Sequence, residues 1–160
     1  MKNTNTTALE TLKLFRIIFK SANRHFHEIE KIVGVGGASL WALAEIGEAQ
    51  SITVSELANS MSIHQSTASN LIDKLEDKGY ISRVRGEQDR RIVNLELTDF
   101  GKEILAKAPL PHKGILPDAL MRLNTSTLSE LNLHLTQLIA SMELKHPNGA
   151  FEPLGQSSLD

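Results

Sequence analysis

Residues 53–98 read TVSELANSMSIHQSTASNLIDKLEDKGYISRVRGEQDRRIVNLELT, and they contain most of the signals that indicate a fold. Thr53 and Glu56 have the spacing of a capping box, in which each side chain hydrogen-bonds the backbone N–H of the other residue. The apolar residues that follow fall on one face of a short helix, which ends in a tight turn at residues 60–64.

A second helix is predicted from about residue 65 to residue 78, with Gly79 as its C-terminal cap. Its apolar positions form one face, made of Ala68, Leu71, Ile72 and Leu75. A rotation of about 100° per residue then directs Ser66, Asn70 and Asp73 outward and leaves Thr67, Ser69 and Lys74 on the flanks. The exposed face of its first half is therefore small, polar and able to hydrogen-bond.

Two short strands, residues 81–85 and 92–97, follow around a polar loop at residues 86–91. Thr98 is placed to cap a further helix through about residue 108, which the next residue, a proline, ends. Helix, tight turn, helix and hairpin in this order are typical of a winged helix-turn-helix. In that fold the second helix enters the major groove of DNA.

Several side chains in this segment are of the types that bind DNA. Ser, Thr and Asn hydrogen-bond base edges, whereas Arg and Lys neutralise phosphates. Four arginines lie within nine residues of the hairpin and are opposed there only by Glu87 and Asp89. An arginine at a hairpin tip is also suited to a narrow minor groove. The candidate DNA contacts are Ser66, Thr67, Ser69, Asn70, Lys74, Arg83, Arg85, Arg90 and Arg91.

Asp73 and Asp77 also face outward and would repel phosphates, so we expect the C-terminal half of the second helix to tilt away from the duplex. The polar residues are also compatible with a surface helix that they only cap and solvate. The arginines are compatible with a solvated turn, but their clustering at the hairpin favours phosphate contacts. A winged helix that binds protein instead of DNA is the alternative function. A DNA affinity that falls with added salt would distinguish the two.

Near each end of the chain, apolar residues recur at steps of three and four, which predicts a long helix with a narrow apolar stripe. The first stripe comprises Leu12, Phe15, Phe19, Ala22, Phe26, Ile29 and Val33. The second comprises Leu128, Leu131, Leu135, Leu138 and Met142, after a capping box of Thr127 and Glu130. These helices can bury their stripes against each other within one chain or against a second copy. We favour a dimer interface.

Between the stripes, Gly34, Gly36 and Gly37 end the first helix, and Ser39 is placed to cap another that runs to about Ile46. The expected fold is mostly α with a small β-hairpin wing. It divides into an N-terminal dimerisation helix (residues 1–38), a winged helix-turn-helix (39–108), C-terminal dimerisation helices (109–146) and a flexible tail (147–160).

Composition excludes several classes of protein. The 160 residues contain no cysteine, which removes disulfides, thiolate metal sites and thiol chemistry. The N-terminus lacks the pattern of a secretory signal, and no apolar run is long enough to cross a membrane. Nucleotide-binding and hydrolase motifs are absent, so no catalytic residue and no cofactor is predicted. We expect a cytoplasmic protein that is not an enzyme.

Residues 40–108 resemble the MarR family of bacterial transcriptional regulators. The similarity is carried by the segments V54-SEL-A58, L71-IDKLEDKGY-I81 and D89-RRIVNLEL-T98, and most specifically by the wing pattern D-x-R followed by L-x-L-T. The resemblance implies a homodimer that binds a pseudo-palindromic operator, usually to repress, and that a small ligand releases. It also implies that Arg91 reaches the minor groove and that Asp89 orients it.

The resemblance further implies an effector site between the dimerisation helices and the winged domain. In some relatives the effector is an aromatic carboxylate, which an arginine fork suits. The candidate ligand contacts are Arg16, His25, His27, Ser39 and Trp41. The alternative is that Arg16 makes a surface ion pair and Trp41 belongs to the core. A metal site at His25, His27 and Glu30 is a weaker alternative, because histidines two residues apart do not share a helix face. No metal ligand is therefore predicted.

Overall fold

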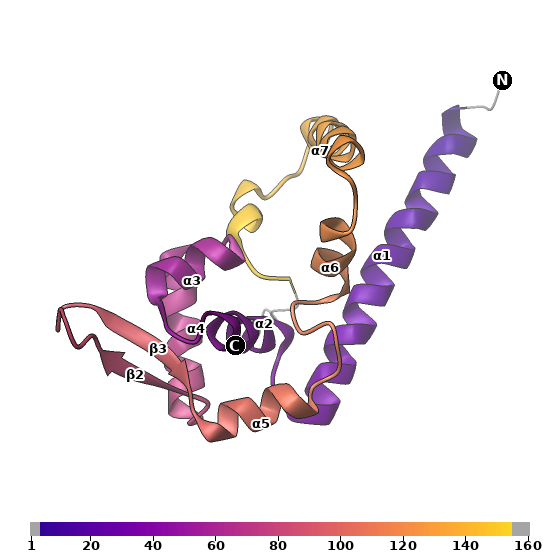
Figure 1. Ribbon diagram of the computed structural model, residues 1–160. Coiled ribbons are helices and arrows are strands. Elements are labelled where there is room, and N and C mark those ends of the chain that lie inside the picture. Colours follow the sequence, from indigo (N-terminus) through magenta and orange to yellow (C-terminus); the bar gives the residue numbers. More distant parts are fainter. Residues whose placement is uncertain (1–3, 155–160) are drawn as a thin grey trace.

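The computed structural model describes residues 4–154 and contains a helical body with a hairpin that extends from it (Figure 1). The elements in chain order are α1 (Thr4–Val33), α2 (Gly37–Ala49), β1 (Ile52–Thr53), α3 (Val54–Met61), α4 (Gln65–Asp77), β2 (Ile81–Arg85), β3 (Val93–Leu97), α5 (Asp99–Lys107), α6 (Ile115–Met121), α7 (Thr125–Ala140) and the 3-10 helix η1 (Pro147–Phe151). The expected fold class is confirmed.

Helices α3 and α4 form the predicted helix-turn-helix. The capping box at the start of α3 is present, since the Thr53 N–H donates to Glu56 Oε2 at 2.8 Å and the Glu56 N–H donates to Thr53 Oγ1 at 3.3 Å. Ser62 ends α3 in the left-handed conformation with φ 53°. This residue makes the sharp turn that brings α4 across α3.

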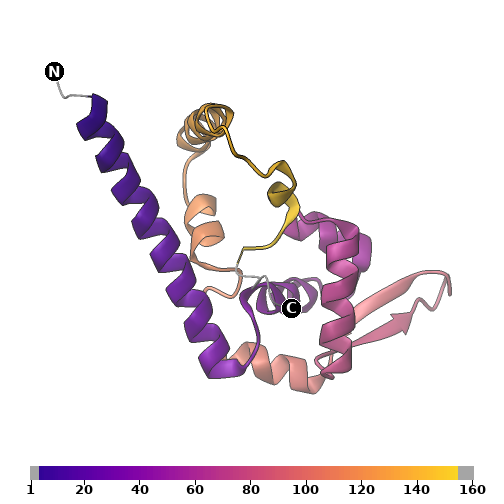
Figure 2. The ribbon, with the colours of Figure 1, turned by 180° about the vertical axis from the view of Figure 1, so that it is seen from behind.

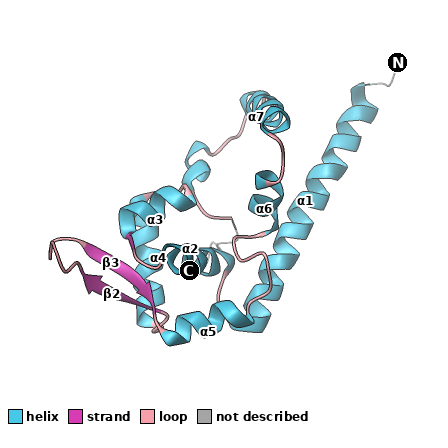
Figure 3. Ribbon diagram, in the orientation of Figure 1, coloured by secondary structure: helices cyan, strands magenta, loops and turns pink. Residues whose placement is uncertain are grey.

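The hairpin is part of a three-stranded antiparallel sheet in the order β1-β3-β2 (Figure 3). Arg83 pairs with Leu95, which in turn pairs with Ile52 on the other side of β3. The sequence did not predict β1, because two residues are too few to show an alternating pattern. The additional strand attaches the base of the wing to the start of α3.

A single buried core joins α2, the helix-turn-helix and the inner face of the sheet. Its fully buried residues include Leu40, Leu43, Ile46, Leu57, Ile72, Leu75 and Leu95. The C-terminal part of α1 contributes Ile29 to this core. At the α1–α2 junction, a Cβ on Gly37 would overlap the ring of Phe26, so only glycine permits this close approach.

Two predicted caps are wrong. Helix α2 begins at Gly37 with Gly36 as its N-cap, so Ser39 lies inside the helix. Helix α7 begins after Asn124, whose side chain accepts from the Thr127 N–H at 2.9 Å. Both errors have the same cause, because several residues near each helix start are chemically able to cap it and local sequence does not decide between them.

The N-terminal half of α1 leaves the body and lies across from α6 and α7 (Figures 1 and 2). A groove of about 480 Å³ runs between these helices, lined by Thr11, Leu14, Phe15, Ile18, Phe19, Leu116, Leu120, Leu131, His134, Leu135 and Leu138. Only part of each predicted stripe faces this groove, namely Phe15 and Phe19 of the first and Leu131, Leu135 and Leu138 of the second. Ile29 of the first stripe belongs to the core instead, and Phe26 and Val33 pack against it. Within one chain the stripes do not close the groove, and Phe19 remains 59% exposed.

The C-terminal segment, predicted to be a flexible tail, contains one short helix among its described residues. Pro147–Phe151 forms η1, and the chain returns to the helix-turn-helix instead of leaving the body. The rest of the tail from residue 155 lies outside the described residues. Across residues 4–154, no single helix is both long and apolar enough for a membrane span; α1 and α2 reach that composition only as a pair bent by 73°.

Candidate DNA-binding surface

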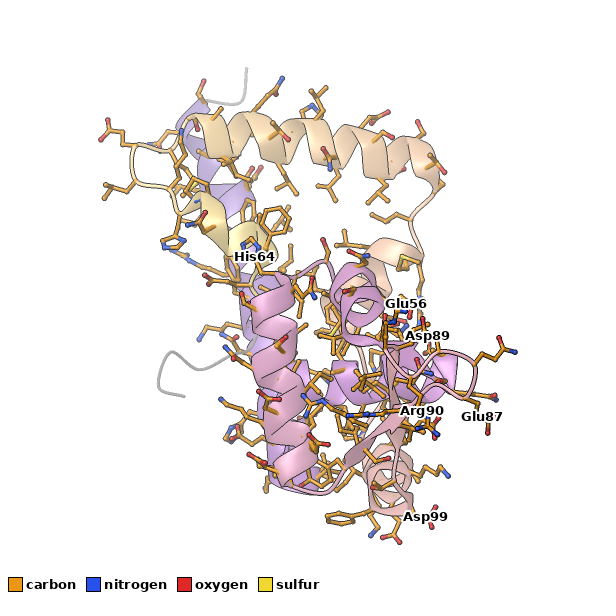
Figure 4. The ribbon with its side chains drawn as sticks, turned by 90° about the vertical axis from the view of Figure 1, so that its left-hand side faces the viewer. Glu56, His64, Glu87, Asp89, Arg90 and Asp99 are labelled. Carbon is orange, nitrogen blue, oxygen red and sulfur yellow. The ribbon has the colours of Figure 1, made fainter. Side chains whose placement is uncertain are left out.

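The outward face of α4 has the exposure that the sequence predicts. Ala68, Leu71, Ile72 and Leu75 are buried against the core. Ser66, Asn70 and Lys74 are exposed, whereas Thr67 and Ser69 are half-buried at the flanks. Figure 4 views the molecule from the side on which α4 and the wing lie together. The face of α4 therefore presents hydroxyl and amide groups without bulky side chains.

Arg83, one of the predicted DNA contacts, forms ion pairs within the chain. Its guanidinium donates to Asp73 at 2.5 Å and also hydrogen-bonds Glu76, so two carboxylates of α4 hold it. The hydrogen bond to Asp73 raises the pKa of Arg83 above its ordinary value, although partial burial opposes this. Two carboxylates of α4 therefore oppose the hairpin arginines in addition to Glu87 and Asp89 of the hairpin itself. Arg83 joins the base of the wing to α4.

The same ion pairs change the interpretation of Asp73. The sequence alone placed an uncompensated carboxylate on the exposed side of α4, which would repel phosphates. The structure instead places a guanidinium against it, so its charge is largely compensated. Sequence reasoning missed this pair because Asp73 and Arg83 belong to different elements. The sequence feature that indicates such a pair is an acidic end of a helix followed by a basic strand.

The tip of the wing is shaped by Asp89. Its carboxylate accepts from the Arg91 N–H at 2.9 Å, which forms an Asx turn, and lies 3.8 Å from Arg91 Nε. The Gly86 N–H donates to the Ile92 carbonyl at 2.9 Å and closes the loop. The Arg91 side chain is 95% exposed. Asp89 thus restrains the backbone at Arg91 while the guanidinium stays open to solvent.

Arg85 and Arg90 are also exposed, and Glu87 and Arg90 project from the wing loop in Figure 4. No ion pair involving Arg85 or Arg90 is found among residues 4–154. The cations available to an anionic partner on this surface are therefore Lys74, Arg85, Arg90 and Arg91.

A contact between the C-terminal end of α4 and the start of α5 fixes the base of the wing on the body. Thr98 Oγ1 donates to the Gly79 carbonyl at 2.6 Å and accepts from the Gly101 N–H at 3.1 Å. A Cβ on Gly101 would overlap the backbone oxygen of Tyr80. The predicted cap residue Thr98 therefore has a second role, which the sequence did not indicate. It holds the C-terminal turn of α4 against the start of α5.

The five side chains predicted to hold an effector lie on α1 and α2 and differ in exposure. Arg16 is exposed and does not line the apolar groove, and His25 lies nine residues, or about 14 Å, further along α1. His25 is buried, with Nε2 3.0 Å from the Pro111 carbonyl, whereas His27 is exposed. Ser39 is half-buried in α2.

Trp41 is part of a network that the sequence did not reveal. Its Nε1 donates to Glu45 at 2.8 Å, and Lys113 bridges Glu45 and Glu48 at 2.9 and 2.8 Å. Burial lowers the pKa of Lys113, but hydrogen bonds to Glu48 and Glu45 more than offset this and raise it overall. The network joins the segment after α5 to α2. Residues 4–154 contain no cluster of three His, Asp or Glu side chains that is arranged to hold a metal.

Comparison with known proteins identifies relatives of this chain. A sequence model of the MarR family matches residues 38–93. The HTH-type transcriptional repressor MdtR of Bacillus subtilis is 31% identical over 110 residues, which cover 66% of this chain and 71% of MdtR. Other relatives are matched over about 60% of their length. The relatives carry names of transcriptional regulators and repressors, and this confirms the expectation of a protein that is not an enzyme.

Solved structures have the same fold. The YusO protein from Bacillus subtilis superposes with a TM-score of 0.55 at 25% identity, over 88% of this chain and 100% of YusO. A mutant MarR from Escherichia coli, solved in complex with operator DNA, gives a TM-score of 0.53 at 20% identity, over 81% of this chain and 96% of that protein. The fold around α4 and the wing is therefore shared with proteins of known structure.

Proposed function

Because this chain belongs to the MarR family, we propose that it acts as a homodimer that binds operator DNA and represses transcription until a small molecule releases it. The observation that carries the proposal is the wing tip, where Asp89 restrains the backbone of an almost fully exposed Arg91. The wing that carries Arg91, with Asp89 and Arg90 labelled, lies on the same side of the molecule as α4 (Figure 4). A DNA-binding role would place the protein in the cytoplasm.

Helix α4 would enter the major groove with its N-terminal half. Ser66 and Asn70 are the exposed groups that reach base edges, and Asn can pair with adenine through two hydrogen bonds. Thr67 and Ser69 flank them. Arg91 would enter the minor groove beside the operator half-site, while Lys74, Arg85 and Arg90 neutralise phosphates. Arg83 is not included, because Asp73 and Glu76 already hold it.

The apolar groove between α1, α6 and α7 supports the dimer. It is lined almost entirely by apolar side chains, and one chain leaves several of them exposed. A second copy related by a two-fold axis would cover these side chains. The same axis would place two α4 helices in successive major grooves, about 34 Å apart.

The effector is the least localised part of the proposal. An aromatic carboxylate remains the candidate class, with Arg16, His25, His27, Ser39 and Trp41 as its contacts, although Arg16 lies about 14 Å from His25 along α1. DNA release by benzoic acid and its hydroxylated derivatives would test it. If release occurs and Arg16→Ala leaves it intact, Arg16 is not part of the site.

The test of DNA binding uses the purified full chain and the DNA fragment upstream of its own gene, measured by fluorescence anisotropy across a salt series. We expect tight, sequence-selective binding whose affinity falls with salt. Arg91→Ala is expected to weaken it at least about tenfold, which corresponds to a loss of about 1.4 kcal/mol. Lys20→Ala, on the exposed side of α1, is the matched control and is expected to bind normally.

Selective binding that Arg91→Ala does not weaken would contradict the wing assignment. Absence of selective binding to this fragment and to a library of genomic fragments would contradict operator binding as a whole. In that case the winged helix would be a protein-interaction module, and its DNA affinity would be low at every salt concentration.

A further inference from the structure

The C-terminal segment returns to the N-terminal end of α4. The Phe151 carbonyl accepts from the His64 N–H at 3.3 Å, and the two rings lie 4.8 Å apart between centroids at an angle of 41°. His64 is the N-cap residue of α4 and has no side-chain capping bond. Figure 4 shows His64 where η1 meets α4, and Figures 1 and 2 show the same proximity from opposite sides.

This interaction is small. Among the described residues it comprises one backbone hydrogen bond and one tilted ring pair, and Phe151 remains 46% exposed. A ring pair contributes about 0.5–1.5 kcal/mol and a hydrogen bond a similar amount. An interaction of this size orders a segment without holding it permanently. The segment is therefore suited to reversible release.

We infer that Pro147–Phe151 is an autoinhibitory latch, which competes with DNA for the N-terminal end of α4. This inference rests on the proposed function, because it concerns the same surface. The N-terminal residues of a recognition helix contact base edges, and the major groove, about 12 Å wide, accommodates little more than one helix. A further segment on the end of α4 does not fit in the groove, so DNA binding requires the latch to open.

The latch also has a physical connection to the proposed dimer interface. Residues 141–146 join it directly to the end of α7, which lines the apolar groove. A shift of α7 on dimerisation or effector binding would change the position from which the latch reaches α4. The state of the interface and the accessibility of the recognition helix are thereby coupled through a short connection.

The first test is Phe151→Ala in the full chain, with binding to the DNA fragment upstream of the gene as the readout. Removal of the ring pair shifts the population toward the open state, so affinity is expected to rise about two- to tenfold. Leu144→Ala is the matched control, because Leu144 lies in the connection that precedes the latch and is 90% exposed. Unchanged or weaker binding by Phe151→Ala would overturn the latch, and weaker binding would mean that the segment supports α4.

The second test locks the latch in place. The chain has no cysteine, so the double variant His64→Cys and Phe151→Cys contains a single possible intramolecular disulfide. We expect it to form on oxidation, and the oxidised protein to bind DNA at least about a hundredfold more weakly than the same protein after reduction. Failure of the disulfide to form, or equal binding by both forms, would refute the latch.

The two tests distinguish failure of the latch from failure of the proposed function. If neither the wild-type chain nor Phe151→Ala binds DNA selectively, operator binding fails, and the yield of the disulfide still reports whether the segment reaches α4. If the wild-type chain binds and Arg91→Ala weakens it while both latch tests are negative, operator binding stands and the latch is refuted.

Discussion

Arg83 shows that a positively charged residue in the arginine cluster can already be neutralised by partners within the chain. It belongs to the same arginine cluster as Arg85, Arg90 and Arg91, but only its guanidinium is held by Asp73 and Glu76. A cation already paired with two carboxylates releases few additional counterions when DNA binds. The four arginines are therefore expected to divide into one structural residue and three that face DNA.

Arg83→Gln is expected to lower the free energy of unfolding by about 0.5–1 kcal/mol, because partly exposed ion pairs contribute little individually. The dependence of DNA affinity on salt should stay as it is in the wild type. Arg90→Gln is the matched variant and is expected to keep the stability of the wild type. Its slope of log affinity against log salt concentration is expected to be smaller by about 0.9 for each phosphate that Arg90 neutralises. Chemical denaturation and a salt titration measure both quantities. A reduced salt slope for Arg83→Gln would show that the structural assignment is incorrect.

Among the elements, α3 has the most clearly defined start. The Thr53 N–H and Oγ1 both donate to Glu56 Oε2 at 2.8 Å. The backbone hydrogen bond, followed by that of the side chain, lowers the pKa of Glu56 below its ordinary value of 4.5. A carboxylate with a lowered pKa stabilises the fold above its ordinary pKa. That stabilisation is lost as the pH falls through the lowered pKa.

The wild type is therefore expected to lose thermal stability relative to Glu56→Gln between about pH 6 and about pH 3. Glutamine keeps the accepting oxygen of a capping box but does not titrate, so the comparison isolates this side chain from the other carboxylates. Thermal unfolding followed by circular dichroism across this range measures the difference in Tm. A difference that stays constant with pH would contradict the assigned role of Glu56.

The elements show how far local sequence determines this fold. The order and approximate bounds of α3, α4, β2, β3 and α5 followed from caps, turn residues and apolar spacing, all of which act within a few residues. The start of α7 was misassigned because Asn124 and Thr127 are both capable of capping. Strand β1 was missed because its two residues are ordered only by their pairing with β3.

For the whole molecule, the open question is the number of chains in the functional unit. The N-terminal half of α1 and helices α6 and α7 enclose a groove whose apolar side chains one chain does not bury. Burial of such a surface is the main favourable contribution to association. Phe19 is suited to a test, because it lines the groove and is exposed enough for a change to leave the single chain folded.

Phe19→Asp is expected to convert a dimer of twice 17.6 kDa into a chain of 17.6 kDa, because a carboxylate is costly to bury without a partner. Operator affinity should fall with it, since two half-sites are no longer bound together. Lys20→Asp changes the charge of the adjacent residue, which does not line the groove, and should remain dimeric. Light scattering during size-exclusion chromatography measures the mass. A Phe19→Asp protein with the wild-type mass would exclude this groove as the interface.

Local sequence was sufficient for the helix-turn-helix, the hairpin and the polar face of α4, because each depends on neighbouring residues and on the period of a helix or strand. Tertiary packing alone decided the partners of Arg83 and the approach of Phe151 to His64. These features join residues from different elements. No local rule brings such residues together, and their meeting depends on how the buried core positions each helix and strand.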